Sequence, residues 1–441
     1  MTSFSIRGWL SRFTALERFL LGILSLITVF SASLIGWQTW LEQTRPVPVV
    51  GGTYTEGVVA ASLADVQPSI NQLTRLGLTR FDVDGNIVGA VADRWEVVDE
   101  GKTYRFSLNP SVSLELVRAA LAENAALFPE IQVEVEEPAS VVFRLKQAFA
   151  PFLATTTTPI FPVGPFSVEE QRKGEVRLVA RPDSLAGAPY LEAITLKMYP
   201  DTFNLTQALA NGDIEGVADT SHVENDRLLG RLSSWELTLP RQIFLFFNTD
   251  RAVVGQTVTR QRLRDGQALD APIALTLVTL ASPQHEQLAE QLVATWSPLG
   301  VQVTVETRTA TELAKQVVPN RDYDALIYGL DFGADPDPYP FWHSSQIGAE
   351  GLNLANFAHI DADRLLEKAR QTQRPDERAT LYAQFQTIFD REVPAISLEQ
   401  VSVVFGTDLG LKGVRSHAGL TPADRYRFVT EWYRKMRRIQ E

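Results

Sequence analysis

Strand-like and helix-like segments alternate through the second half of the chain, and this order constrains the fold more than any other feature of the sequence. Apolar, β-branched runs predict strands, and segments with apolar residues every three or four positions predict helices. Strands are expected at 272–280, 301–308 and 323–330, with helices between them at 283–296 and 310–317. This alternation predicts an α/β fold with a mixed, partly parallel sheet that helices cover.

The first half of the chain has a different pattern, in which strands come in pairs. Alternating apolar residues around a turn at Glu100-Gly101 predict one hairpin, and a second is expected at 131–145. The segment 112–128 between them has helical spacing. A chain of 441 residues is too long for one ordinary core, so we expect two or more lobes.

An uncharged, mostly apolar run occupies residues 19–37, after the basic residues Arg7, Arg12 and Arg18. As a helix, these 19 residues would be about 28 Å long, close to the ~30 Å hydrocarbon core of a bilayer. The basic flank predicts a single-pass anchor in the cell membrane, with a cytoplasmic N-terminus and an extracytoplasmic bulk. A cleaved signal peptide ending near 31–33 is the alternative. The apolar run continues beyond those residues, which favours the uncleaved anchor.

Composition and motif searches exclude several classes of function. The net charge of −12 argues against a nucleic-acid partner, because phosphate binding requires a basic surface. The chain has no cysteine, and its five histidines show no helical pairing, so we predict neither a metal site nor a cofactor. No GxSxG motif is present, and we predict no catalytic residues and no enzymatic activity. A hydrolase whose carboxylates meet only in the folded chain is the enzymatic alternative.

The stretch 329-GLDFGADPDPYPFWHSS-345 concentrates acidic, proline and aromatic residues. Its acids are Asp331, Asp335 and Asp337. Three interpretations are open: a cluster of catalytic or metal-binding carboxylates, a rigid structural loop, or the floor of a ligand pocket. Asp-Pro pairs form rigid turns unaided, and Asp337 is also placed to cap the next helical turn.

Several segments after residue 50 carry a family pattern in a fixed order. They are 51-GGTYTEG-57, 78-LTRFDVDGNIVGAVADRWEVVDEGKTYRFSL-108, 162-PVGPFSV-168, 189-PYLEAITLKMYPDTFNLTQALANGDIEGV-217, 243-IFLFFNT-249, 323–345 and 353–400. In this order they resemble the extracytoplasmic solute-binding proteins of ABC importers for oligopeptides and dipeptides, a group that also contains nickel binders. Each segment alone is a weak match, and their joint order makes the resemblance specific.

The chain departs from the family pattern in three places. Two regions are shorter than usual, one after 108-LNP-110 and one after Asn248. The lipobox cysteine of many relatives is missing, and Trp37 stands at a plausible position for it. The resemblance therefore implies a trimmed relative in which an apolar helix replaces a lipid anchor.

The resemblance implies a two-lobed, periplasmic-binding-protein-like fold (type II, peptide-binder) with mixed sheets. Residues 1–45 would form the cytoplasmic N-terminus, transmembrane anchor and spacer. Lobe one would comprise 46–245, with 76–158 as a reduced subdomain. Lobe two would comprise 246–398, and 399–441 would return to lobe one.

The function implied by the resemblance is binding without catalysis. The chain would capture a peptide-like solute between its lobes and deliver it to an ABC transporter permease. Asp335 matches the aspartate that receives the peptide ammonium in relatives, a charge-assisted bond of about 1.5–3 kcal/mol. Tyr339, Phe341 and Trp342 are the expected wall residues of the ligand site. Asn248, at the corner between strand and hinge, is a further candidate for contact with the solute.

A different class of function stays open, that of a trimmed relative that does not transport and acts as an envelope scaffold or sensor. The two shortened regions favour it. The basic segment 434-RKMRR-438 also favours it, because it suits a protein partner or an anionic membrane surface. A solvated face is the alternative interpretation of that segment. A cavity between the lobes around Asp335 would instead favour transport.

Overall fold

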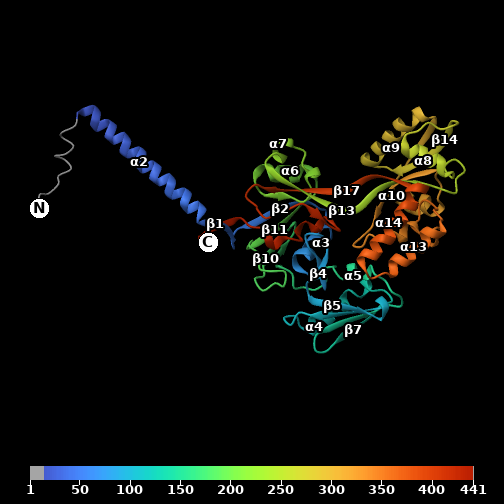
Figure 1. Cartoon of the computed structure of the whole chain (residues 1–441), viewed down its shortest axis with the longest axis horizontal. Helices are drawn as coiled ribbons and strands as arrows, with labels where there is room; N and C mark the ends of the chain where they lie inside the picture. The colour runs from blue at the N-terminus through green and yellow to red at the C-terminus, as the bar shows by residue number, and fades with distance from the viewer. Residues whose placement is uncertain (1–13, 441) are drawn as a thin grey trace.

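The structure is a computed structural model that describes residues 14–440. It begins with helix α2 (Ala15–Glu42), which extends away from the rest of the molecule (Figure 1). Within the described residues, no helix combines the length and hydropathy that a membrane span requires. The predicted anchor at 19–37 is therefore not confirmed. Residues 1–13, the predicted cytoplasmic N-terminus, lie outside the described range.

A sheet of eleven strands runs through the body of the molecule. Across it the order is β15-β14-β16-β13-β17-β12-β2-β11-β10-β9, with β18 paired to β13. The strands are β2 (Thr53–Val59), β9 (Phe166–Arg172), β10 (Glu175–Ala180), β11 (Ala193–Tyr199), β12 (Gly216–Val217), β13 (Leu232–Phe247), β14 (Ile273–Leu280), β15 (Val301–Arg308), β16 (Ala325–Asp331), β17 (Ala395–Asp408) and β18 (His417–Ala418). β14 pairs in parallel with both β15 and β16, so the predicted α/β class with a partly parallel sheet is confirmed.

Two long strands connect the lobes. β13 and β17 pair antiparallel, from Leu232 opposite Asp408 at one end to Phe246 opposite Ala395 at the other (Figure 1). Their register is interrupted between Thr238 and Gln242, a stretch in which Pro240 lacks an N–H donor, and again between Ile243 and Phe244. The predicted lobe boundaries fall inside these two strands, and the residue ranges given for the lobes stay predictions.

Lobe two contains β14, β15, β16 and the adjoining ends of β13 and β17, and it has a core on each face of the sheet. Phe244 and Phe246 pack in one core, and Ile243, Leu245 and Phe247 pack in the other. Successive side chains of a strand point to opposite faces, so one apolar run fills both cores. The covering helices are α8 (Thr257–Asp265), α9 (Pro283–Trp296), α13 (Ile360–Gln371) and α14 (Pro375–Glu392). The helix predicted at 310–317 is a short α-helical turn that continues as a π-helical turn.

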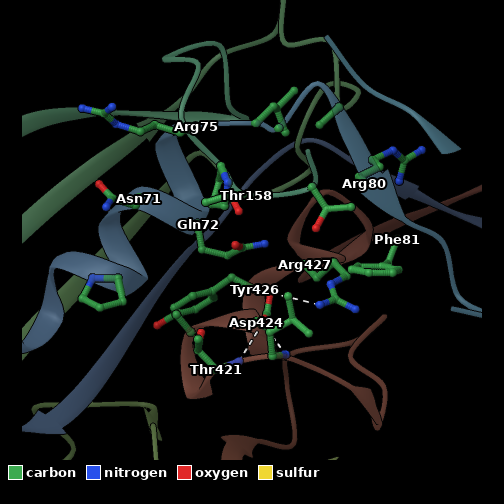
Figure 2. Close-up of a pocket in the computed structure, with 18 of the residues that line it drawn as sticks. Asn71, Gln72, Arg75, Arg80, Phe81, Thr158, Thr421, Asp424, Tyr426 and Arg427 are labelled. Carbon is green, nitrogen blue, oxygen red and sulfur yellow. Dashed lines mark hydrogen bonds and ion pairs between the residues drawn. The ribbon is translucent and has the colours of Figure 1, made fainter. Parts of the chain in front are cut away.

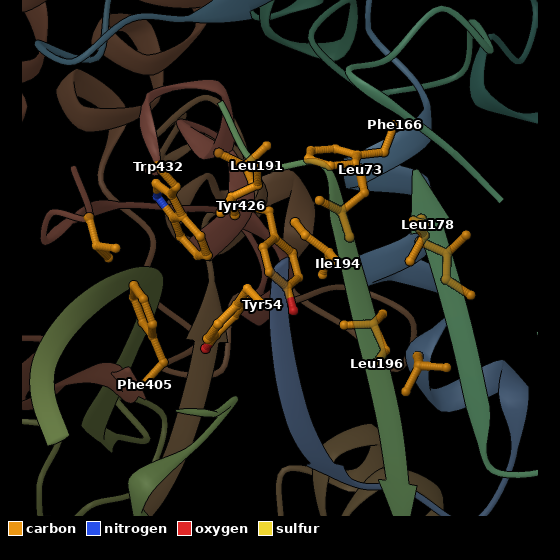
Figure 3. Close-up of a cluster of buried hydrophobic side chains, with 14 of the residues drawn as sticks. Tyr54, Leu73, Phe166, Leu178, Leu191, Ile194, Leu196, Phe405, Tyr426 and Trp432 are labelled. Carbon is orange, nitrogen blue, oxygen red and sulfur yellow. The ribbon is translucent and has the colours of Figure 1, made fainter. Parts of the chain in front are cut away.

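The core of lobe one lies between helix α3 (Leu63–Thr74) and the sheet (Figure 3). Strands β2, β10, β11 and β17 contribute to it, together with the C-terminal segment. The labelled members of this core are Tyr54, Leu73, Phe166, Leu178, Leu191, Ile194, Leu196, Phe405, Tyr426 and Trp432. The C-terminal segment therefore packs against β2. The predicted return of residues 399–441 to lobe one stays a prediction.

An ion pair is buried inside this lobe. Glu56 on β2 is 0% exposed, and its carboxylate accepts a hydrogen bond from Nε of Arg425 at 3.0 Å. The hydroxyl of Tyr426 donates to the same carboxylate oxygen. Burial alone would lower the pKa of Arg425, but the charge of Glu56 raises it above its usual value. The pair fixes the C-terminal segment to β2.

The subdomain has a separate four-stranded sheet and a core of its own. Its strands, in spatial order, are β5 (Ala92–Val98), β6 (Thr103–Leu108), β8 (Ser140–Arg144) and β7 (Gln132–Glu136). Both predicted hairpins are present. The helix predicted at 112–128 is shorter: α4 (Leu114–Glu123) ends where Nδ2 of Asn124 donates to the carbonyl of Ala120. A short pair, β3 (Thr79–Phe81) and β4 (Ile87–Gly89), connects lobe one to this sheet.

Candidate functional site

Asp335, the predicted ammonium contact, is bound to an arginine of the chain itself. Both of its carboxylate oxygens accept hydrogen bonds from the guanidinium of Arg378 on α14, one of them at 2.6 Å. Each of the two side chains is 15% exposed. Such two-point pairs are strong and directional, so a solute ammonium would have to displace Arg378 to reach Asp335. The ammonium contact stays a prediction, and the structure places an internal cation at that position.

The pair is further held by neighbouring groups. A guanidinium nitrogen of Arg378 donates to the hydroxyl of Tyr382 at 2.6 Å. Burial alone would lower the pKa of Arg378, but its bonds to Asp335 raise it above the usual value. Burial also raises the pKa of Tyr382 well above its usual value. Arg378 therefore keeps its charge, and Tyr382 stays neutral, across the physiological pH range.

Asp337 acts as a structural cap. One carboxylate oxygen accepts a hydrogen bond from the backbone N–H of Tyr339 at 3.1 Å, at the start of α12 (Tyr339–Trp342). The other oxygen accepts from Nε of Arg370 at 2.7 Å. This arrangement agrees with the interpretation of the loop as a rigid structural element.

Two of the predicted wall residues are core residues of lobe two. Trp342 is 3% exposed and Phe341 is 6% exposed. The ring of Trp342 stacks on Phe246 with 5.6 Å between centroids, and it meets Phe389 edge-on at 4.6 Å. The short helix α12 places both rings in the core of lobe two, where burying their apolar area is favourable. As placed here, they do not line the surface of a ligand site.

Asn248 is also a structural residue in this arrangement. Its side chain is buried, and its Nδ2 donates to the carbonyls of Arg321 at 3.0 Å and Tyr323 at 3.2 Å. Its Oδ1 accepts from Nδ2 of Asn356 at 3.1 Å. These bonds hold the corner that follows β13, and they use the polar atoms that a solute would need.

Tyr339 lies at a contact between lobe two and the subdomain. The guanidinium of Arg370 sits 4.1 Å from the centroid of the Tyr339 ring and 5.1 Å from that of Phe149 in the subdomain. The backbone N–H of Ala150 donates to the carbonyl of Arg370 at 2.9 Å. We call this set the Arg370 contact. Its side chains also line a hollow of about 530 Å³.

A second bond strengthens the Arg370 contact. The hydroxyl of Tyr104 in the subdomain donates to Oε1 of Gln373 in lobe two at 3.0 Å, and burial raises the pKa of Tyr104 to about 12. Gly101, with φ of +91°, leaves the space that Gln373 occupies, since a Cβ there would lie 2.5 Å from its amide nitrogen. The subdomain therefore contacts lobe two at a turn where glycine is required.

A cavity lies away from this loop, between lobe one and the subdomain (Figure 2). Its volume is about 520 Å³. We call it the lobe-one cavity. Its charged and polar lining includes Gln72, Arg75, Arg80, Thr158, Asp424 and Arg427, and its aromatic lining includes Phe81, Tyr426 and Phe428. An apolar and aromatic wall with a few convergent polar groups is typical of small-molecule sites.

Helix α3 supplies one wall of the cavity. Asp65 accepts a hydrogen bond from the backbone N–H of Ser62 at 2.8 Å and so fixes the start of the helix. Its apolar face, which includes Ile70 and Leu73, is buried in the core of lobe one. Because a helix has two faces, Asn71, Gln72 and Arg75 lie toward the cavity.

The C-terminal segment supplies the opposite wall. One oxygen of Asp424 accepts hydrogen bonds from the N–H groups of Leu420 at 2.6 Å and Thr421 at 2.9 Å, and its other oxygen meets Arg427 at 3.1 Å. Arg427 also donates to the carbonyl of Ala418 at 2.9 Å. Its guanidinium lies 5.3 Å from the centroid of the Phe81 ring on β3. Arg427 is thus fixed at the edge of the cavity.

Sequence reasoning missed this cavity. Most of its residues come from α3, β3, the segment 157–160 and the segment 420–431, which only the fold brings together. The local signals were the matching segment that starts at residue 78 and the Thr/Pro-rich stretch 155-TTTTPIFPVGPF-166. As for metals, no group of three or more acidic or histidine side chains within residues 14–440 is arranged to hold an ion.

Comparisons with known proteins identify similar sequences and folds, although no family model matches the chain. The chain is 22% identical over 322 residues to the oligopeptide-binding protein AppA of Bacillus subtilis (strain 168), a match that covers 58% of this chain and 59% of that protein. It is 22% identical over 440 residues to the probable D,D-dipeptide-binding periplasmic protein DdpA of Escherichia coli (strain K12), with 76% and 84% covered. The solved structure of the ABC transporter substrate-binding protein CtaP of Listeria monocytogenes has a TM-score of 0.70 at 18% identity, and covers 87% of this chain and 99% of its own.

These similarities agree with the architecture. The structural match shows the α/β periplasmic-binding-protein fold of peptide-binding proteins. The sequence matches run through most of the body of the chain, although the chain spans only 59% of the length of AppA. The chain is therefore similar in sequence to oligopeptide- and dipeptide-binding proteins, and it shares the periplasmic-binding-protein fold.

Proposed function

We propose that the chain captures a peptide-like solute in the extracytoplasmic space and delivers it to the permease of an ABC transporter. Two relatives carry names that specify oligopeptide and D,D-dipeptide binding, which supports a peptide-like solute. The two lobes are joined by β13 and β17, and lobes joined by a few strands are suited to hinge movement, which solute-binding proteins use.

The lobe-one cavity is the observation that carries this proposal. Its volume of about 520 Å³ falls within the ~300–1,000 Å³ of small-molecule sites. It lies at the junction of lobe one and the subdomain, and each of these two parts supplies some of its walls. A solute held there would contact α3, β3 and the C-terminal segment at once.

Native mass spectrometry of the purified chain, followed by calorimetric titration with mixed di- to pentapeptides, tests the proposal. We expect a co-purified solute or binding of at least one peptide class. The absence of both a co-purified solute and binding at millimolar peptide concentration would reject it.

The second candidate function is that of a relative that does not transport and acts as an envelope scaffold or sensor. The Asp335–Arg378 pair favours it, because the position predicted for the solute ammonium already holds a cation. The Arg370 contact favours it as well, since groups of the protein itself join lobe two to the subdomain. Binding of peptides in the calorimetric titration would exclude the scaffold role.

A further inference from the structure

The lobe-one cavity carries more basic than acidic side chains. Three arginines line it, Arg75, Arg80 and Arg427, against the two acids Asp424 and Glu431. This surplus contrasts with the whole chain, whose net charge is −12. Charge complementarity between a site and its ligand gives specificity, so the balance of free charges in the cavity indicates which solutes it selects.

Both acids are already bound by groups of the protein. Asp424 accepts bonds from two backbone N–H groups and from Arg427, as described above. Glu431 is paired with Arg415, which lies outside the cavity lining. Neither carboxylate is therefore free to receive a solute cation.

Two of the arginines are also engaged. Arg75 donates to the carbonyl of Ile160 at 3.1 Å and pairs with Glu123 at 3.5 Å. Arg427 is held by Asp424 and by the Phe81 ring. Arg80 differs from both: it is exposed, and within residues 14–440 its guanidinium has neither a hydrogen bond nor an ion pair. It lies on the same side of the cavity as Phe81 and Arg427 (Figure 2).

Neutral donors complete the site. The side chain of Gln72 extends between Thr158 and Arg427 (Figure 2), and its amide has no hydrogen-bond partner in the described part of the chain. An amide N–H and a hydroxyl donate readily to carboxylate oxygens.

We propose that the lobe-one cavity selects solutes that carry a carboxylate, and that Arg80 binds this group at the edge of the cavity, with Gln72 and Thr158 as further donors. The inference rests on the proposed function and names the solute class of the same site. The carboxylate is either the C-terminus of a peptide or an acidic side chain. Arg80 is the specificity-determining residue, since it supplies the one cation of this lining that has no partner among the described residues.

Three tripeptide libraries provide the test: free acids, the same sequences as C-terminal amides, and amides with glutamate at the last position. Affinities are measured by calorimetry on the full chain and on Arg80→Gln. Loss of a charge-assisted bond corresponds to about tenfold or more in affinity, so the free acids should bind about tenfold more tightly than the amides. Arg80→Gln should reduce this preference to about threefold or less. Recovery of binding by the glutamate amides would assign the group to side chains, and no recovery would assign it to the C-terminus.

Arg94→Gln is the matched control, because Arg94 is an exposed arginine on β5 outside the cavity lining. It should keep the full preference for free acids. Equal binding of acids and amides by the unmodified chain would overturn the inference, as would an undiminished preference in Arg80→Gln. Failure of all three libraries to bind would instead reject the proposed function. Thermal unfolding of both variants should match the unmodified chain, since both side chains are exposed.

Discussion

The acidic loop of lobe two (residues 329–345) and the lobe-one cavity both contain aspartates and arginines, but the two regions differ in which of these side chains are paired. In the loop, Asp335 and Asp337 are both bound by arginines, and the network is closed. In the cavity, Asp424 is bound by Arg427, while Arg80 has no partner within the described residues. Acidic residues concentrated in a short stretch attract attention in a sequence, but a ligand can use only the groups that the fold leaves unpaired.

The largest loss of stability is expected at the buried ion pair of lobe one. Arg425→Met leaves Glu56 buried without its cation, and removing one partner of a buried ion pair costs about 3–5 kcal/mol. Urea unfolding should show this loss in the free energy of unfolding. The double change Glu56→Gln, Arg425→Met should recover part of it, because no charge is then left buried. A loss below about 1 kcal/mol in the single variant would show that the cavity does not depend on this pair.

The pair in the loop should matter less, because water reaches it. Arg378→Met leaves Asp335 unpaired at 15% exposure, and we expect a loss of about 1–3 kcal/mol in urea unfolding. Arg374→Met is the control, since Arg374 lies in an exposed pair at the start of the same helix and should contribute about 0.5 kcal/mol or less. Equal losses in the two variants would contradict a structural role for the Asp335–Arg378 pair.

The pH dependence of stability should identify a contribution from lobe one. Burial lowers the pKa of His417 below its usual 6.5, so the folded state favours the neutral ring. The stabilisation is complete above the unfolded pKa and is lost as the pH falls below 6.5. The free energy of unfolding of His417→Phe should therefore fall less steeply on acidification. Parallel profiles for the two proteins would show that His417 does not contribute.

The smallest effect is expected for solute affinity at the acidic loop. Asp335→Asn should change the affinity for the tripeptide acids by about twofold or less, because Asp335 is already neutralised by Arg378. The titration is run at a temperature where circular dichroism shows the variant folded. A loss of affinity of about tenfold or more would place the solute at the acidic loop and not in the lobe-one cavity.

The sequence predicted the architecture better than the candidate site, for physical reasons. Strand and helix periodicity is local, so the order from 272 to 330 and the two hairpins of the subdomain were predicted correctly. The pairing of Asp335 with a residue 43 positions away depends on how α14 packs against the loop, which no local pattern specifies. Phe341 and Trp342 illustrate the same limit, since aromatic residues in a loop suit a binding wall or a core equally well. The cavity combines segments that are far apart in the chain, so it could be found only after folding.

The Arg370 contact has a consequence for how fast a solute can exchange. It joins the subdomain to lobe two, whereas β13 and β17 join lobe two to lobe one at another place (Figure 1). Movement of lobe two must either separate Arg370 from Phe149 or carry the subdomain with it. In the second case the moving junction is the one that contains the lobe-one cavity. Residues remote from the solute, above all Phe149 and Arg370, would then set its residence time.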